Sequence, residues 1–296
     1  MTEYNNNEIN HYDDGVCVCN QARQTNEIKS NILFDKSKIV KIELKITHIK
    51  SIKNPIFTTI TTMSIKRVLV FDTETNGLLP ARDKKTQLPI ICEYPYILQL
   101  SFVLYNLESG IIEETYNNYI KVSDDVIISN KITEITGITK EICMEKGVPI
   151  TNALYEFYHA YMLSDRIIAH NISFDKNMLE LEIFRNREHL RSIPESYFLF
   201  NDMFNSVHNI DTYCTMTNTK QYCNIMINGR YGPFKKAPKL VELHDKLFEF
   251  TPTNLHDAMI DTLVCLKCYL KHEHERLLPD KIDEFLKSGG SSSDYF

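Results

Sequence analysis

The sequence predicts an α/β fold, and three observations favour that class. From Lys66 onward, segments with the pattern of strands alternate with segments with the pattern of helices. Short, wholly apolar runs such as residues 68–71 are typical of central strands covered on both faces. Other segments repeat apolar residues every three or four positions, which is the spacing of a helix packed on a core.

The elements follow in order between residues 66 and 271, each from its own pattern. Strands are expected over residues 68–71, 96–104, 111–120, 166–169 and 209–213, which together predict a five-stranded sheet. Four helices are expected from apolar residues at helical spacing. The first covers residues 153–162 and is marked by Leu154, Phe157 and Tyr161. The others are centred on three further sets: Phe174, Met178 and Leu181; Leu240, Leu243 and Leu247; and Met259, Leu263, Leu266 and Leu270.

Three parts are expected along the 296 residues. Residues 1–63 form an N-terminal extension, of which residues 1–36 are too polar to bury a core. Within it, Val40, Ile42, Leu44 and Ile46 alternate with polar residues, as in one half-buried strand. Residues 64–280 form the folded domain, and residues 281–296, with a Gly/Ser-rich stretch, form a flexible tail.

Composition limits the classes of protein. Hydrophobic residues make up 43% and charged residues 24% of the chain, which excludes a mostly disordered or collagen-like protein. No run of about 18 uncharged apolar residues occurs, so no membrane span is expected, and the N-terminus lacks the pattern of a secretory signal. The eight cysteines are expected as reduced thiols of an intracellular protein, cytoplasmic or nuclear. The net charge, 33 − 39 = −6, argues against a basic coat protein but not against an enzyme that acts on nucleic acid.

Acidic residues end the first central strand. Asp72 and Glu74 are two positions apart, so both side chains project to the same face. Two adjacent carboxylates repel each other, and they stay ionised only when a cation or a shared proton relieves that repulsion. Gly77 offers the positive φ for a tight turn over such a site. Alone, an Asp-x-Glu pair is more often a polar strand end than a metal site.

Two later motifs add a histidine and two more acids. Asp175 falls in the first turn of the helix that follows strand 166–169, where the helix dipole favours an anion. His256 stands just before the last predicted helix, and Asp261 lies about one turn inside it. Because all these groups lie at strand or helix ends of one α/β chain, we expect them to reach a common rim.

Together the acids predict a two-metal site. Asp72, Glu74, Asp175 and Asp261 carry a charge of −4, which two divalent cations neutralise. Oxygen ligands suit Mg²⁺ or Mn²⁺ rather than zinc. Two ions about 3.5–4 Å apart support in-line phosphoryl displacement, one generating the hydroxide and the other steadying the departing alkoxide. His256 is then the general base, because histidine side chains exchange protons near neutral pH.

The order of these motifs resembles a known family. Asp-x-Glu, then His-Asn-x-x-Phe-Asp at residues 170–175, then His-x-Ala-x-x-Asp at residues 256–261 is similar to the DEDDh 3′–5′ exonucleases, in particular to the proofreading epsilon subunit of bacterial DNA polymerase III and its stand-alone relatives. The likeness covers residues 66–271. It implies a ribonuclease H-like fold with a mixed sheet, and it assigns the four acids to two metals and His256 to the base. It departs at Asn76, where a second threonine is commoner.

The resemblance also implies substrate contacts. Residues 135–139, Ile-Thr-Gly-Ile-Thr, resemble the family segment that lies against the terminal nucleotide. Ile138 of this segment, with Thr75, Gly77 and Asn171 of the acidic motifs, is therefore expected to bind substrate.

A basic segment predicts a second contact with the substrate. Residues 220–246 hold six Lys or Arg and two acids, a local charge of 6 − 2 = +4, interleaved with Tyr222 and Tyr231. Cations meet phosphates and aromatic rings stack on bases, a combination that suits a single strand. Arg230, Lys235 and Lys236 are expected to hold single-stranded nucleic acid or the 3′ end of a duplex. The alternative is an ordinary solvated loop.

The leading hypothesis is an exonuclease that releases nucleoside monophosphates from the 3′ ends of DNA, alone or in a polymerase or repair complex. Two alternatives stay open: an exoribonuclease or oligoribonuclease, which uses the same five residues, and a non-catalytic nucleic-acid-binding module on the same fold. A zinc site is a further alternative for Cys214, Cys223, Cys265 and Cys268, although cysteines three positions apart on a helix are more often buried apolar residues.

Overall fold

A computed structural model describes residues 64–80, 91–248 and 255–287 of the chain. Residues 65–296 form a compact unit of their own. The strand predicted at residues 40–46, and the N-terminal extension that contains it, lie outside the described ranges. None of the helices within those ranges has the length and apolarity that crossing a membrane requires.

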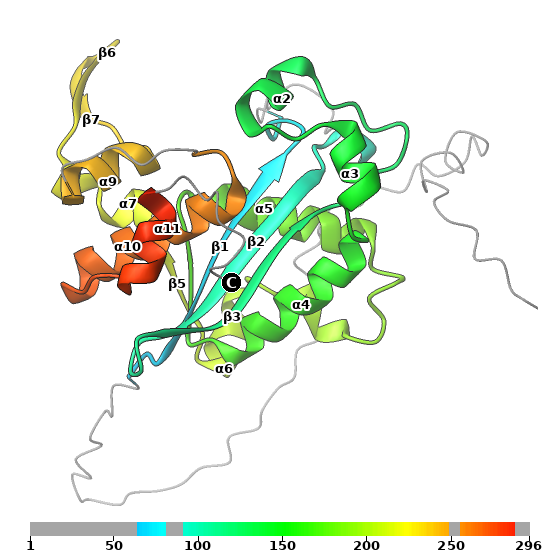
Figure 1. The fold of residues 1–296 in the computed structure, drawn as a ribbon, viewed down its shortest axis with the longest axis horizontal. Coiled ribbons are helices and arrows are strands. Elements are labelled where there is room, and N and C mark those ends of the chain that lie inside the picture. Colours follow the sequence, from blue (N-terminus) through cyan, green and yellow to red (C-terminus); the bar gives the residue numbers. More distant parts are fainter. Residues whose placement is uncertain (1–63, 81–90, 249–254, 288–296) are drawn as a thin grey trace, which may run out of the picture. The chain divides into compact units, whose positions relative to one another are not determined.

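A five-stranded mixed sheet forms the centre of this unit (Figure 1). The order is β3–β2–β1–β4–β5, in which β1, β2 and β3 pair antiparallel and β4 and β5 run parallel to β1. The strands are β1 (Arg67–Thr75), β2 (Ile97–Asn106), β3 (Ile111–Tyr119), β4 (Arg166–Ala169) and β5 (Asp211–Cys214). All five predicted strands are confirmed, and β4 agrees in both bounds.

Helices cover both faces of the sheet, because β1 is apolar on both. Leu69 and Phe71 point into a core shared with α4 and α5, whereas Val68 and Val70 point into a second core shared with α10. The four predicted helices correspond to α4 (Ile150–Leu163), α5 (Ile172–Arg185), α9 (Leu240–Phe248) and α10 (Ala258–His274). Helix α10 is apolar nearly all round, since it packs against β1, β2, α9 and α11.

Further elements were not evident from periodicity. Two short helices, α2 (Asn130–Thr136) and α3 (Lys140–Lys146), begin after the N-caps Ser129 and Thr139. Others are α6 (Asp202–His208), α7 (Thr215–Asn218) and α8 (Lys220–Cys223), with 3₁₀ turns at Ile91–Glu93 and Pro194–Phe198. The basic segment contains a hairpin, β6 (Met226–Gly229) and β7 (Gly232–Lys235), which extends away from α9 in Figure 1.

The predicted start of the flexible tail at residue 281 is wrong. Helix α11 (Asp280–Lys287) occupies residues 281–287, with Phe285 and Leu286 buried in the core that α10 shares with the sheet. Lys267 of α10 also pairs with Asp283. The apolar residues at 282, 285 and 286 have helical spacing, which was the available sequence signal. Residues 288–296 lie outside the described ranges.

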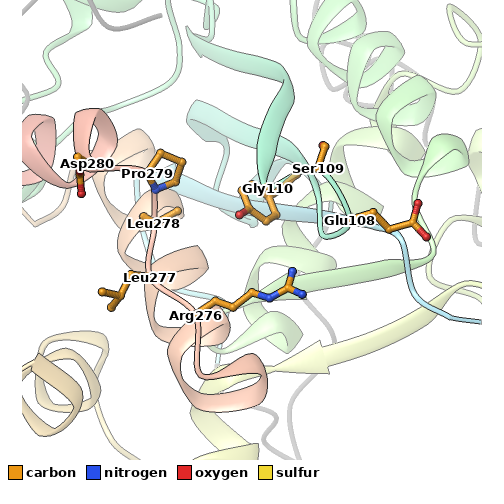
Figure 2. A pocket seen from close by; sticks show the side chains of 9 residues that line it. Glu108, Ser109, Gly110, Arg276, Leu277, Leu278, Pro279 and Asp280 are labelled. Atoms are coloured by element: carbon orange, nitrogen blue, oxygen red, sulfur yellow. The ribbon is translucent and has the colours of Figure 1, made fainter.

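A cavity of about 470 Å³ lies between the β2–β3 turn and the link from α10 to α11 (Figure 2). Glu108 and Arg276 are among its lining residues. Since Arg67 at the start of β1 pairs with Asn106 at the end of β2, this cavity lies at the opposite end of β1 from Asp72 and Glu74.

Candidate active site

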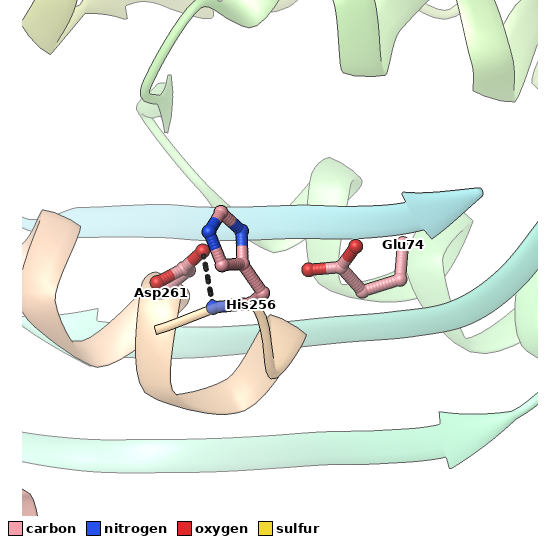
Figure 3. A group of neighbouring side chains, drawn as sticks. All are labelled: Glu74, His256 and Asp261. Atoms are coloured by element: carbon pink, nitrogen blue, oxygen red, sulfur yellow. Dashed lines mark hydrogen bonds between the residues drawn. The ribbon is translucent and has the colours of Figure 1, made fainter. Parts of the chain in front are cut away.

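The alternation along β1 determines where its acids lie. Residues 68, 70, 72 and 74 share the face that α10 covers, so Asp72 and Glu74 emerge beside the first turn of that helix. Within the described ranges, one group of three potential ligand residues has its ligand atoms within 4.8 Å of one another: Glu74, His256 and Asp261. Figure 3 shows the imidazole of His256 between the carboxylates of Glu74 and Asp261.

The fourth acid, Asp175, reaches the same strand end from the other side of the sheet. It lies in the first turn of α5, as predicted, and is 3% exposed. Its Oδ1 accepts hydrogen bonds from the backbone N–H of Thr73 at 3.1 Å and from the Thr73 hydroxyl at 2.7 Å. These bonds hold Asp175 at the strand position between Asp72 and Glu74.

Crowding and burial make the ionised site unfavourable without a cation. Burial and the charges of the other three acids raise the pKa of Asp72 well above its ordinary range. Burial and the charges of Asp261 and Asp175 raise the pKa of Glu74 to about 8. Burial likewise raises the pKa of Asp175 and of Asp261 to about 7. Bound cations would reverse these shifts, because they stabilise the charged form.

One atom of the site favours a bound metal ion. The Oδ1 of Asp261 is buried and has no hydrogen-bond partner. A carboxylate oxygen only accepts, so an unpaired buried one is costly unless a cation or a proton meets it. The carboxylate oxygens of Glu74 and Asp261, with the charges of Asp72 and Asp175 nearby, suit a hard cation rather than zinc.

His256 has an unusual backbone. It is exposed, and its φ of 79° lies in the left-handed region that residues other than glycine seldom occupy. Its N–H donates to the Oδ2 of Asp261 at 3.3 Å. The next residue, Asp257, caps α10 by accepting the N–H groups of Met259 and Ile260. Such strain is typical of functional positions.

The expected substrate residues near β1 have different positions. Thr75 is 8% exposed, and its hydroxyl donates to the Gly77 carbonyl at 2.7 Å, so it shapes the turn. Gly77 lines a cavity, but the predicted positive φ is wrong: this glycine is not among those in the left-handed region. Asn171 precedes α5 with a φ of 66° and is half-buried.

Ile138 does not reach the surface of the site. It is 1% exposed and packs in a small core with Leu98, Val122 and Val126. An isoleucine side chain gains more from that core than from a wet substrate surface. The expectation that its side chain binds substrate is therefore wrong.

Asn76, the residue that departs from the family pattern, organises the turn after β1. Its amide donates to the Ile127 carbonyl at 3.0 Å, and its Oδ1 accepts from the Tyr96 N–H at 2.6 Å. Asn76 thereby connects the end of β1 to Tyr96 and Ile127. All three residues line a cavity of about 260 Å³, which Gly77 and Leu78 line as well. The pair Asn76-Gly77 is the sequence signal for this turn, because Asn and Gly are both favoured in turns.

The basic residues lie on and beside the hairpin. Arg230 is exposed at its tip, with its guanidinium 5.7 Å from the centre of the Tyr231 ring. Lys235 donates to Gln221, and Lys236 pairs with Glu242 at 2.5 Å. A phosphate would therefore compete with Glu242 for Lys236.

One histidine ties the base of this segment to the sheet. The imidazole of His170, which follows β4, contacts the Pro238 carbonyl at 3.1 Å through Nε2 and the Thr215 hydroxyl at 2.9 Å through Nδ1. Because β4 is parallel to β1, His170 lies at the edge of the sheet where β1 ends. The base of the hairpin therefore adjoins the edge that carries the acids.

The cysteine alternative gains no support. Cys223, Cys265 and Cys268 are buried, and Cys214 is half-buried. Across the described residues, these thiols do not form a group with ligand atoms within 4.8 Å of one another. Cys265 instead contacts the Thr215 hydroxyl at 3.6 Å.

Comparison with known proteins bears on the family. The RNase_T family model, described as Exonuclease, matches residues 69–269, which is more than half of the chain and agrees with the span predicted from the motifs. No curated protein matches the chain.

Solved structures of exonuclease I share the fold. E. coli exonuclease I in complex with a dA16 oligonucleotide has a TM-score of 0.50 and 19% identity, and the match covers 74% of this chain and 43% of that chain. Exonuclease I from Methylocaldum szegediense has a TM-score of 0.50 and 15% identity, again covering 74% and 43%. This chain thus spans less than half the length of these relatives. The likeness confirms the ribonuclease H-like fold, whereas the particular similarity to the epsilon subunit stays a prediction.

Proposed function

The chain belongs to the RNase_T exonuclease family, the DEDDh 3′–5′ exonucleases, and on that premise we propose that it removes nucleoside monophosphates from the 3′ ends of DNA with the help of two divalent cations. The observation that carries the proposal is the group of Glu74, His256 and Asp261, whose ligand atoms lie within 4.8 Å of one another. Asp175 is held beside this group at Thr73, and the charges of these acids act on Asp72. A binding module has no need of a base beside a costly cluster of acids.

The acids would hold the cations, with Mg²⁺ as the expected ion and Mn²⁺ as a substitute. Asp72, Glu74, Asp175 and Asp261 offer only oxygen, and the unpaired Oδ1 of Asp261 is one free ligand position. Bound there, the cations lower the pKa of a water molecule and stabilise the charge that develops on the leaving oxygen.

His256 would act on the attacking water. Its ring is exposed beside Glu74 and Asp261, where it can accept the proton that the water loses. The hydrogen bond from its N–H to Asp261 keeps the main chain next to a metal-binding carboxylate. This bond therefore couples the position of His256 to that of Asp261.

The strand would approach along the hairpin. Oligonucleotide complexes of E. coli exonuclease I, with dA16 and dT13, support a single strand as the substrate. Arg230, Lys235 and Lys236 would neutralise its phosphates, and the cavity beside Gly77 and Asn76 would receive its end. DNA is preferred to RNA on the likeness of residues 72–77 to the proofreading branch.

Matched DNA and RNA oligomers of one sequence, labelled at the 5′ end, test this proposal. We expect a ladder that shortens from the 3′ end, faster for DNA, and no reaction when the 3′ end is blocked. Faster loss of RNA would instead identify an exoribonuclease, because the sugar 2′-OH is the group that distinguishes the two substrates. Binding without products in fresh Mn²⁺ would contradict the enzyme.

A further inference from the structure

We propose that Gln99 is a positioning residue for the active site: its side-chain amide fixes the first turn of α10 and thereby the placement of His256 and Asp261. The inference rests on the proposed exonuclease function. Gln99 itself is 2% exposed, so its side chain is closed off from a substrate on the surface.

The sheet places Gln99 directly beneath the site. On β2 it pairs with Glu74 of β1, and Ser101 pairs with Asp72. Residues opposite each other on antiparallel strands point to the same face, with Cβ atoms about 4.5–5.5 Å apart. Gln99 therefore lies on the face that α10 covers, next to the acids.

Both N–H groups and the carbonyl oxygen of the Gln99 side-chain amide form hydrogen bonds. Nε2 donates to the Oδ1 of Asn117 at 2.9 Å and to the Oδ2 of Asp257 at 3.2 Å, and Oε1 accepts from the N–H of Ala258 at 3.3 Å. The carboxylate of Asp257 determines which way the Gln99 amide points. If the amide were flipped, its Oε1 would face the Oδ2 of Asp257, and two acceptors cannot form a hydrogen bond.

Asp257 links this amide to the helix. Its Oδ1 accepts the N–H groups of Met259 and Ile260, which is the N-cap of α10, and its Oδ2 accepts from Gln99. With the Ala258 bond, a single buried side chain attaches both the cap and the first residue of α10 to β2.

Two functional residues depend on this attachment. His256 precedes the cap in a strained conformation with a φ of 79°, and Asp261 is in the first turn. Without the Gln99 bonds the helix end could shift along β2 and carry both residues with it. A displacement of about 1 Å at reacting groups costs on the order of 10²-fold in rate.

Gln99→Met tests the proposal, because methionine has nearly the same shape but no hydrogen bonds. We expect kcat to fall by about 10²-fold with KM for a single strand unchanged, since the proposed strand contacts come from other elements. Calorimetric titration should also show weaker Mn²⁺ binding, because Asp261 moves. Ser101→Ala is the matched control: it removes a bond to the same Asn117 oxygen but leaves Asp257 untouched.

A second variant keeps the test decisive if Gln99→Met is poorly folded. Asp257→Ser preserves an N-cap, for which serine equals aspartate, but is too short to reach Gln99. It should lower kcat as Gln99→Met does, and the double variant should lose no more than the worse single one.

Equal kcat losses in Gln99→Met and Ser101→Ala would overturn the proposal, as would a normal kcat in either Gln99→Met or Asp257→Ser. Those results are distinct from failure of the proposed function, in which the wild-type protein itself would not hydrolyse the strand.

Discussion

Replacing Asp175 with asparagine should stabilise the metal-free protein while abolishing its activity. The substitution removes one buried charge from the acidic cluster. It keeps an Oδ1 that can accept both hydrogen bonds from Thr73. The local structure should therefore survive, and the change reports on the charge itself.

The pKa of Asp175 gives the size of the effect. Burial raises it from 3.8 to about 7. Between these values the folded state keeps a proton that the unfolded chain has released, so stability falls as pH rises, by about 1.4 kcal/mol for each pH unit. The total is on the order of 4 kcal/mol, reached above pH about 7. The variant should match the wild type near pH 4 and exceed it by an amount of that order at pH 8.

Urea unfolding in EDTA at several pH values measures this difference. Glu182→Gln is the comparison variant. Burial raises the pKa of Glu182 too, but its carboxylate pairs with Arg185 at 2.7 Å, so its replacement deprives a buried guanidinium of its acid and should destabilise the protein. Mg²⁺ should then stabilise the wild type more than the Asp175 variant. If Asp175→Asn is no more stable than the wild type at pH 8 in EDTA, burial does not penalise the charge of Asp175 as described.

Three further outcomes are expected. His256→Ala should lower kcat by about 10²–10⁴-fold, as loss of a general base does, and calorimetric Mn²⁺ affinity should stay close to that of the wild type; a collapse of metal affinity would contradict the role of base. Changing Arg230, Lys235 and Lys236 together to alanine should raise KM far more than it lowers kcat, and should reduce the salt slope by about 0.7 for each lost phosphate contact. An unchanged KM and slope would mean that the strand is held elsewhere. A chain that starts at Met63 should stay folded and active, because residues 65–296 form a compact unit; loss of folding, seen by circular dichroism, would show that the extension belongs to the domain.

The fold was predictable from the sequence where a strand or helix shows its own pattern of apolar and polar residues. The wholly apolar start of β1 and its polar end determine both the centre of the sheet and the position of Asp72 and Glu74. The same alternation that buries Val68 and Val70 directs these acids toward α10. Local spacing is enough for such a conclusion, because strand side chains have a fixed period.

Other features depend on contacts between distant residues. Gln99 and Asp257 are 158 positions apart, and nothing in either segment alone indicates that they meet. Ile138 belongs to a motif, but only the packing of Leu98 and Val126 shows that its side chain is buried. Asn228-Gly229 is a turn signal that indicates a hairpin, but it places the turn too early: both residues are in β6, and the turn lies at Arg230 and Tyr231.

Metal-dependent hydrolysis by the wild-type protein and by Asp72→Ala is the most direct test of the central claim. A 5′-labelled single strand is incubated with each protein in Mg²⁺, and with the wild type in EDTA. The two-metal account predicts stepwise shortening from the 3′ end by the wild type in Mg²⁺ alone, with Asp72→Ala inactive although folded. Hydrolysis by Asp72→Ala at the wild-type rate would show that the acids at the end of β1 are not the active site.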